Sequence, residues 1–229
     1  MKRSEINKII VDALEFADKM NFRLPPFARW TPEQWAAVAD NREYDEIRDN
    51  MLGWDITDFG SGDYHKIGLL MFTIRNGNYG MDKYTKPYAE KMLITEEKQV
   101  TPFHFHRMKM EDIINRGGAD LVVQLYNATG DEAHFADTPV HVSMDGRNFE
   151  LPAGSLVRVK PGESITLLPG CYHSFWAEGG KVLIGEVSKV NDDRIDNRFY
   201  EQTGRFPKIE EDEKPITLLS MDYSEGCNV

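Results

Sequence analysis

The sequence predicts a mainly β fold: a jelly-roll β-barrel with a helical extension before it and an irregular segment after it. From Ile67 onward, short runs rich in β-forming residues alternate with Gly, Asn, Asp and Pro, and no amphipathic helix separates them. Many short strands at regular spacing are typical of all-β barrels and sandwiches. The residues before this region carry helical periodicity instead.

The N-terminal extension carries two helix signals. Apolar residues recur at helical spacing at Ile6, Ile9, Ile10, Ala13, Leu14 and Ala17. Ser4 precedes this stripe and is expected to cap its helix, which would cover a sheet face or meet another subunit. Thr31 and Gln34 are spaced as a capping box for a second helix. With a short helix expected over 41–51 and glycine-rich turns after it, residues 1–60 are expected to be helix and loop.

The barrel is expected over residues 61–190. Its strands are expected at 67–75, 88–95, 98–106, 120–127, 140–143, 150–159, 163–168, 172–177 and 181–188. Turns are expected at Gly117-Gly118, Thr129-Gly130, Asp145-Gly146 and Glu178-Gly179-Gly180.

The last part of the chain, residues 191–229, is polar and rich in acids and does not resemble a strand-bearing core. The acidic run 210–213 predicts a solvated face. A long irregular segment after a barrel strand often closes over the mouth, so a lid is an alternative to a plain surface loop. We expect 1–60, 61–190 and 191–229 to form one structural domain.

Composition limits the partners. A chain of 229 residues and 26.3 kDa is long enough for one well-cored domain, and 41% hydrophobic with 28% charged residues is ordinary for a soluble globular protein. The net charge of -11 argues against nucleic acid, because phosphate binding needs clustered Lys and Arg. The same charge disfavours anionic substrates, so a small neutral substrate fits better.

The compartment is expected to be the reducing cytoplasm. The chain has two cysteines, Cys171 and Cys227, and its first residues do not lead into the apolar run of a signal peptide. No stretch is long enough to span a bilayer, so a membrane partner is not expected. We expect Cys171 to be a small buried apolar residue and not a ligand.

A metal site is indicated by the stretch 101–118. In an extended strand, His104 and His106 point to the same face and can reach one ion. Glu111 follows after enough chain to turn back and add an oxygen ligand, and a third imidazole is available at His173. Three imidazoles and a carboxylate suit a divalent ion such as Mn, Fe, Co, Ni or Zn and leave positions open to substrate oxygens.

The two halves of this site resemble the motifs of the cupin family. The pattern HxHx4E followed by glycine resembles the first cupin motif. The run from Gly162 through Pro169-Gly170 to His173 resembles the second cupin motif. Here Pro and Gly are contiguous, where the usual pattern separates them by one residue. The resemblance implies a cupin jelly-roll barrel.

Longer stretches narrow the resemblance to the D-lyxose isomerase family of sugar isomerases, over nearly the whole chain. They are MKRSEIN, LPPFARW, EKMLITEEKQVTPFHFHRMKMEDIINRGG and RFPKIEEDEKP. The resemblance implies a metal-dependent aldose–ketose isomerase, of the D-lyxose ketol-isomerase type, acting through a metal-bound cis-enediol. It would interconvert D-lyxose and D-xylulose, and also D-mannose and D-fructose. It further implies Mn²⁺ as the preferred ion and a homodimer.

Aldose–ketose isomerisation needs a base and an acid near the ion. Lys91 interrupts an apolar strand on the same face as Leu93, where it could meet substrate or simply protect a sheet edge. Glu186 shares a face with apolar residues of its strand, and if that face is the barrel interior, burial should raise its pKa and suit it to be the base. Glu111 could be ligand and base in one, which would make Glu186 dispensable.

Other polar residues are candidates for contact with substrate. Gln124 is the single polar residue in an apolar run and could bind a sugar hydroxyl or satisfy a neighbour. Asp193 and Arg194 could reach the substrate from the loop after the last strand, and Lys109 could neutralise Glu111 or face water. The other histidines, His65, His134 and His141, lie outside both motifs and are expected to be ordinary surface or core residues.

Two other classes of function remain open from the residues alone. Three histidines and a glutamate in a cupin also serve iron dioxygenases and manganese decarboxylases. A non-catalytic sugar-binding cupin is a third possibility, although a sensor usually carries a DNA-reading module, and neither a second domain nor a basic face is visible here.

Overall fold

The computed structural model describes residues 1–204 and 207–224, and of residues 193, 194 and 224 it describes the backbone alone. The helices are α1 (Arg3–Lys19), η1 (Pro26–Arg29), α2 (Pro32–Ala37), η2 (Arg42–Tyr44), α3 (Asp45–Asp49), α4 (Asp193–Asp196) and η3 (Ser220–Ser224). The strands are β1 (Gly53–Thr57), β2 (Leu69–Arg75), β3 (Tyr88–Thr95), β4 (Thr101–His106), β5 (Glu111–Ala128), β6 (Phe135–Ala136), β7 (Val140–Met144), β8 (Arg147–Leu151), β9 (Leu156–Val159), β10 (Ser164–Leu167), β11 (Cys171–Lys189) and β12 (Asn197–Phe199).

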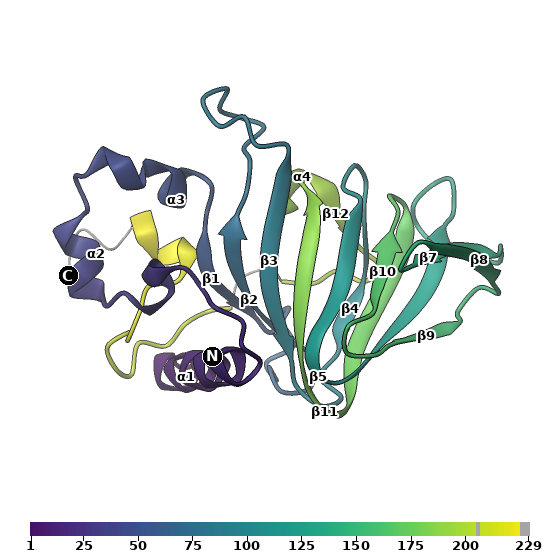
Figure 1. The fold of residues 1–229 in the computed structure, drawn as a ribbon, viewed down its shortest axis with the longest axis horizontal. Helices are drawn as coiled ribbons and strands as arrows, with labels where there is room; N and C mark the ends of the chain where they lie inside the picture. The colour runs from purple at the N-terminus through teal and green to yellow at the C-terminus, as the bar shows by residue number, and fades with distance from the viewer. Residues whose placement is uncertain (205–206, 225–229) are drawn as a thin grey trace.

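The mainly β prediction is confirmed. The strands of the described part of the chain join in one 12-stranded sheet, in which the named strands pair antiparallel. The main path runs β1-β2-β3-β11-β5-β10-β7-β8, and β4 attaches to β11 with β12 on its other side. The sheet curves around one apolar interior and leaves its β1–β3 end beside the helices (Figure 1).

Two long strands, β5 and β11, form the centre of the sheet. The prediction of turns at Gly117-Gly118 and Glu178-Gly179-Gly180 is wrong, because these residues lie within the two strands. Both Gly117-Gly118 and Gly179-Gly180 lie inside these strands, where the register shifts. Gly118 has φ +102°, and a Cβ atom there would lie 2.2 Å from the carbonyl oxygen of Lys181. The glycines therefore bend two paired strands and do not end them.

The turn at Asp145-Gly146 is confirmed. These two residues alone separate β7 from β8, and both have positive φ, 49° and 80°. That geometry matches the twist of the flanking strands in a two-residue hairpin. By contrast, the strand expected over 150–159 is two strands, β8 and β9, separated by a turn at Pro152 to Ser155.

Helix α1 covers the outer face of the sheet at its β1–β3 end (Figure 1). Its buried Ile6, Ile10 and Ala13 pack in one cluster with Trp54 of β1 and Phe72 of β2. The sheet therefore has two apolar layers, one inside the barrel and one under α1. The first prediction for this stripe, cover of a sheet face, is confirmed.

The expected cap of α1 is wrong. The N-cap residue is Lys2, without a side-chain cap. Ser4 lies in the first turn, and its backbone N–H and its hydroxyl both donate to the carboxylate of Asp212, at 2.9 and 2.7 Å. An acid from the distant C-terminal segment thus satisfies the helix end. The capping box of Thr31 with Gln34 is confirmed at α2.

Strand β1 lies within the region expected to be helix and loop. Its residues Gly53–Thr57 are all buried and pair with β2, so the sheet begins before residue 60. Its five buried positions lack the alternation that marks a half-exposed strand, because α1 covers one face and the barrel interior the other.

The C-terminal segment is less isolated than its composition suggests. Strand β12 pairs with β4, and the chain then returns to α1, where Glu210 exchanges backbone hydrogen bonds with Met1 and Arg3. In the acidic run, Glu211 pairs with the buried guanidinium of Arg3 at 2.6 Å and Glu213 accepts from Asn7. The expected solvated face is therefore partly a docking contact for α1.

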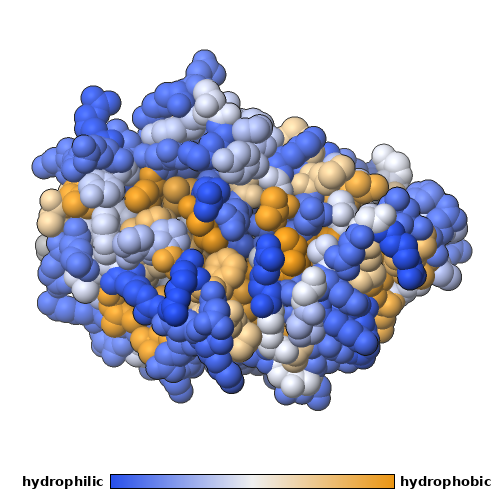
Figure 2. All heavy atoms as spheres, viewed as in Figure 1, coloured by the Kyte–Doolittle hydropathy of each residue, from blue (hydrophilic) through white to orange (hydrophobic). Residues whose placement is uncertain are grey.

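The face seen in Figure 2 is largely hydrophilic, with hydrophobic side chains in scattered groups. In the described ranges, no helix combines the length and apolar character that crossing a membrane requires.

Candidate metal centre and active site

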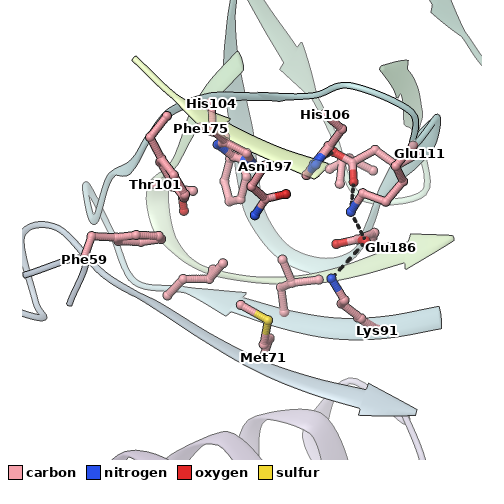
Figure 3. A pocket seen from close by; sticks show the side chains of 15 residues that line it. Phe59, Met71, Lys91, Thr101, His104, His106, Glu111, Phe175, Glu186 and Asn197 are labelled. Carbon is pink, nitrogen blue, oxygen red and sulfur yellow. Dashed lines mark hydrogen bonds and ion pairs between the residues drawn. The ribbon is translucent and has the colours of Figure 1, made fainter. Parts of the chain in front are cut away.

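The barrel interior brings His104, His106 and His173 together. On β4, strand alternation points both histidines inward, and His173 of β11 pairs directly with His104. All three side chains are buried, and their ligand nitrogens lie within 4.8 Å of one another. Figure 3 shows His104 and His106 projecting into the same cavity from the strand above it.

Backbone carbonyls orient two of the imidazoles. His104 Nδ1 lies 2.8 Å from the oxygen of Pro102, and His173 Nδ1 lies 3.0 Å from the oxygen of Cys171. A carbonyl can only accept, so each Nδ1 carries the proton and each Nε2 is left as a free donor of an electron pair toward the centre. Burial, together with the imidazoles of His173 and His106, holds the pKa of His104 well below its usual value, which keeps it neutral.

Glu111 approaches the histidines as expected. Residues 107–110 turn the chain back after β4, and Glu111 begins β5 with its Oε1 atom 3.4 Å from His106 Nε2 and 3.3 Å from His173 Nε2. Burial raises the pKa of Glu111, but Lys109 and His106 lower it more, so the carboxyl stays ionised. An ionised carboxylate against two imidazole nitrogens is an arrangement that fits a cation.

A second charged cluster lies beside the histidines (Figure 3). Glu186 of β11 is directly opposite Lys91 of β3, and its Oε1 atom lies 3.3 Å from Lys91 Nζ and 2.8 Å from Lys109 Nζ. Lys109 also reaches Glu111 Oε2 at 2.7 Å. All four side chains are buried, so two ammonium groups and two carboxylates balance one another in a medium where an unpaired charge is costly.

The prediction of a raised pKa for Glu186 is wrong. The interior position is as expected, and burial alone raises the pKa of the carboxyl. Lys109 and Lys91 outweigh burial, however, and hold the pKa below its ordinary value. Glu186 is therefore ionised at neutral pH, which is the protonation state that a base needs before it acts.

Asn191 and Asp196 support this machinery and were not found from the sequence. Asn191 Oδ1 accepts from Lys91 Nζ at 2.7 Å and from Lys109 Nζ at 3.1 Å. The carboxylate of Asp196 is buried, accepts from the backbone N–H of Met108 at 2.6 Å and lies 3.7 Å from His106 Nδ1. Both follow β11 in a polar stretch whose composition resembles a surface loop, and no local pattern separates them from their neighbours.

The remaining candidates are Gln124, Asp193 and Arg194. Gln124 does not line the cavity: its side chain donates to the oxygen of Gly154 at 3.1 Å, on the opposite face from the barrel residues Val123 and Leu125. The side chains of Asp193 and Arg194 lie outside the described part of the structure, so their expected contact with substrate stays a prediction.

Cys171 is buried, and two of the histidines outside the motifs lie at the surface. Burial raises the pKa of the Cys171 thiol to about 12, with the charge of Glu111 adding to the effect, as suits a buried apolar residue. His65 and His141 are exposed, and each has a glutamate neighbour.

The donor atoms fit a divalent ion. Three imidazoles and a carboxylate form a nitrogen–oxygen set without thiolate, which suits Mn, Fe, Co, Ni or Zn. Within residues 1–204 and 207–224, the buried His173 Nε2 has no hydrogen-bond partner, and a bound ion would accept its lone pair. The fold and the site thus define a cupin-type barrel enzyme with a candidate divalent-metal centre next to a lysine–glutamate cluster.

Comparison with known proteins gives the family. A sequence model described as D-lyxose isomerase matches residues 1–223. The D-lyxose/D-mannose isomerase of Serratia proteamaculans is 48% identical over 225 residues, covering 97% of this chain and 98% of that protein. That of Escherichia coli O157:H7 is 47% identical over 227 residues, covering 98% and 99%. The chain belongs to the D-lyxose isomerase family and is a sugar isomerase that interconverts an aldose and a ketose.

The fold comparison agrees. The L-ribose isomerase of Cellulomonas parahominis, solved without ligand, superposes with a TM-score of 0.60 at 16% identity, covering 92% of this chain and 98% of that one. The L-ribose isomerase of Geodermatophilus obscurus gives 0.58 at 12% identity, with the same coverage. At these identities the likeness concerns the fold, and it confirms the cupin-like architecture.

Proposed function

We propose that the chain interconverts D-lyxose with D-xylulose and D-mannose with D-fructose at the cavity that holds His104, His106 and Glu186. The observation that carries the proposal is the position of an ionised carboxylate, Glu186, between two ammonium groups in the same cavity as the histidine cluster. The two curated relatives named D-lyxose/D-mannose isomerase support the choice of sugars.

Glu186 is the base in this proposal. Its carboxylate removes the proton from C2 of the open-chain aldose and returns it to C1, so that a cis-enediol lies between aldose and ketose. Lys91 and Lys109 bind the oxygens on C1 and C2, stabilise the negative charge that develops there and move the hydroxyl proton. Both ammonium groups already touch Glu186, so substrate oxygens bound to them lie next to the base.

The metal ligands proposed are His104, His106, Glu111 and His173, with Mn²⁺ as the resident ion. When bound, the ion supplies Lewis acidity that polarises the substrate carbonyl. Glu111 would be a ligand and not the base, because its carboxylate is held against His106, His173 and Lys109. Asp193 and Arg194 remain candidates for contact with the sugar. We also propose that the protein acts as a homodimer in the cytoplasm.

The activity is tested first with D-lyxose and D-mannose under anaerobic conditions. Protein stripped with chelator should form no ketose, and reloading with Mn²⁺ should restore ketose formation, because the ion would supply the Lewis acidity that polarises the carbonyl. Failure of every divalent ion to support ketose formation, together with oxygen consumption on Fe²⁺ in air, would favour an oxygenase.

The roles of the two glutamates are separated by matched substitutions. Glu186→Gln should retain the metal and lose turnover by about 10²–10⁴-fold, the usual contribution of a positioned base. Glu111→Gln should lose metal content after gel filtration, and the exposed control Glu150→Gln should change neither. Full turnover in Glu186→Gln would assign the base to another residue.

A further inference from the structure

The end of the cavity away from Lys91 and Glu186 contains a buried hydroxyl that the reaction steps above do not use. Thr101 is 1% exposed and lines the cavity, and its Oγ1 atom has no hydrogen-bond partner among the described residues. In Figure 3, Thr101 and Phe59 lie at one side of the cavity, whereas Lys91 and Glu186 lie at the other. Because a buried hydroxyl without a partner costs stability, its presence here calls for a ligand.

A β-bulge points Thr101 into the barrel. Strict alternation along β4 would place Thr101 on the outer face with Phe103 and Phe105, away from His104. The register with β11 shifts, however: His104 faces His173 and Thr101 faces Phe175, so three steps on β4 match two on β11. The extra residue turns Thr101 to the same cavity as His104. Bulges next to active sites commonly reorient one side chain in this way.

The wall beside Thr101 is aromatic and held in an unusual conformation. Phe199 of β12 stacks on His104 with ring centroids 5.3 Å apart, and Phe59 lies 5.7 Å from Phe199. Phe59 has φ +51°, which is rare for a bulky residue, and hydrogen bonds from its N–H to Thr57 and from Gly204 to its carbonyl hold it there. Such strain at a cavity wall is typical of functional positions.

We propose that Thr101, Phe59 and Phe199 form the subsite for the part of the sugar remote from its carbonyl. Thr101 hydrogen-bonds a hydroxyl beyond C2, and the two rings cover the carbon chain. This assignment rests on the proposed function, because it takes the carbonyl end of the sugar to lie at Lys91 and Glu186. D-lyxose and D-mannose differ at the remote end, so this subsite contacts the part of the substrate in which pentose and hexose differ.

The test removes the hydroxyl and keeps the shape. Thr101→Val, loaded with Mn²⁺, should raise KM for both sugars about tenfold, the worth of one neutral hydrogen bond, with kcat changed less than about twofold. The Kd of D-arabinitol, the polyol of D-lyxose without a carbonyl, should rise by the same factor in calorimetry. Metal content should not change. The melting temperature should not fall, because the orphaned hydroxyl is gone.

Two controls make the result specific. Thr101→Ser keeps the hydroxyl and should restore KM and Kd. Thr217→Val removes another buried hydroxyl without a partner in the described chain, away from the cavity, and should leave both constants unchanged. Wild-type constants in Thr101→Val, or equal loss in Thr101→Ser, would overturn the proposal. If the wild-type protein isomerises neither sugar, the proposed function fails, while D-arabinitol binding still tests the subsite.

Discussion

At the scale of single residues, the cavity contains four buried charged side chains, and pairing with opposite charges keeps them ionised. Lys91, Lys109, Glu111 and Glu186 are each at most 4% exposed, and every one of them has an oppositely charged neighbour within 3.5 Å. The pairing, and not burial, decides the protonation state of Glu186. The neutral residue Asn191 binds both lysines without changing the net charge of the cluster.

Asn191 should therefore be needed for the stability of the cluster. Asn191→Ala removes one acceptor shared by two buried ammonium groups and should lower the free energy of unfolding by about 1–3 kcal/mol. The measurement is urea unfolding of the metal-free protein, with the exposed residue Asn148→Ala as the control. Equal stability of the two variants would mean that water replaces the amide oxygen.

Protonation of His104 should make the stability of the protein fall as the pH is lowered. His104 has a folded-state pKa well below its usual 6.5, so the folded state binds fewer protons than the unfolded state below that pH. Its contribution is complete above about pH 6.5 and is lost as the pH falls toward the folded pKa, by up to about 1.4 kcal/mol per pH unit. Glu111 and Glu186, also lowered, act in the same direction below their usual 4.5.

This pH dependence is measured by unfolding chelator-treated protein at pH 7.5 and 5.5. His104→Gln should reduce the difference in stability between the two pH values, whereas the exposed control His141→Gln should leave it as in the wild type. An unchanged difference in His104→Gln would mean that another group takes up the proton.

At the scale of elements, β5 and β11 form the central pair of the sheet and depend on glycine where they bend. Gly118→Ala would place a Cβ atom 2.2 Å from the oxygen of Lys181 at φ +102°. We expect a loss of roughly 2–4 kcal/mol in the free energy of unfolding, from backbone strain and steric overlap together. Gly130→Ala, where nothing lies within 4 Å, is the matched control and should be nearly neutral.

The Gly118→Ala substitution also tests the site, because β5 begins at Glu111 and β11 carries Glu186. Urea unfolding gives the stability, and Mn²⁺ content reports whether the shift reaches the histidines. Similar stability of the two alanine variants would mean that the strands can bend elsewhere.

At the scale of the whole molecule, the C-terminal segment links the helical layer to the cavity. The same segment supplies Asn197 and Phe199 to the cavity wall and Glu211 and Asp222 to the buried guanidinium of Arg3. Glu211 and Asp222 thus fasten this segment to α1, while Asn197 and Phe199 close one side of the site.

Arg3→Met tests this link. Asp222 is 14% exposed and would lose its cationic partner, so the free energy of unfolding should fall by about 2–4 kcal/mol. Hydrogen exchange should increase over 208–222 before it increases in β11. The exposed pair is the control: Arg23→Met, opposite Asp18, should cost less than about 1 kcal/mol. Unchanged exchange over 208–222 would show that other contacts hold the segment.

Much of this protein follows from local sequence. Alternation placed His104 and His106 on one face and Glu186 with Val182 and Ile184, and the spacing of apolar residues predicted α1. These expectations hold because a side chain's face depends mainly on its own backbone conformation.

Three features were decided only by the tertiary structure, and each depends on contacts with residues far along the chain. Local alternation places Thr101 outside, but a register shift against β11 turns it inward. Burial alone predicts a raised pKa for Glu186, but lysines from β3 and from the turn after β4 reverse it. Ser4 lies in the first turn of its helix and bonds to Asp212, more than 200 residues away. In each case the deciding contact crosses between segments, and no periodicity within one segment encodes it.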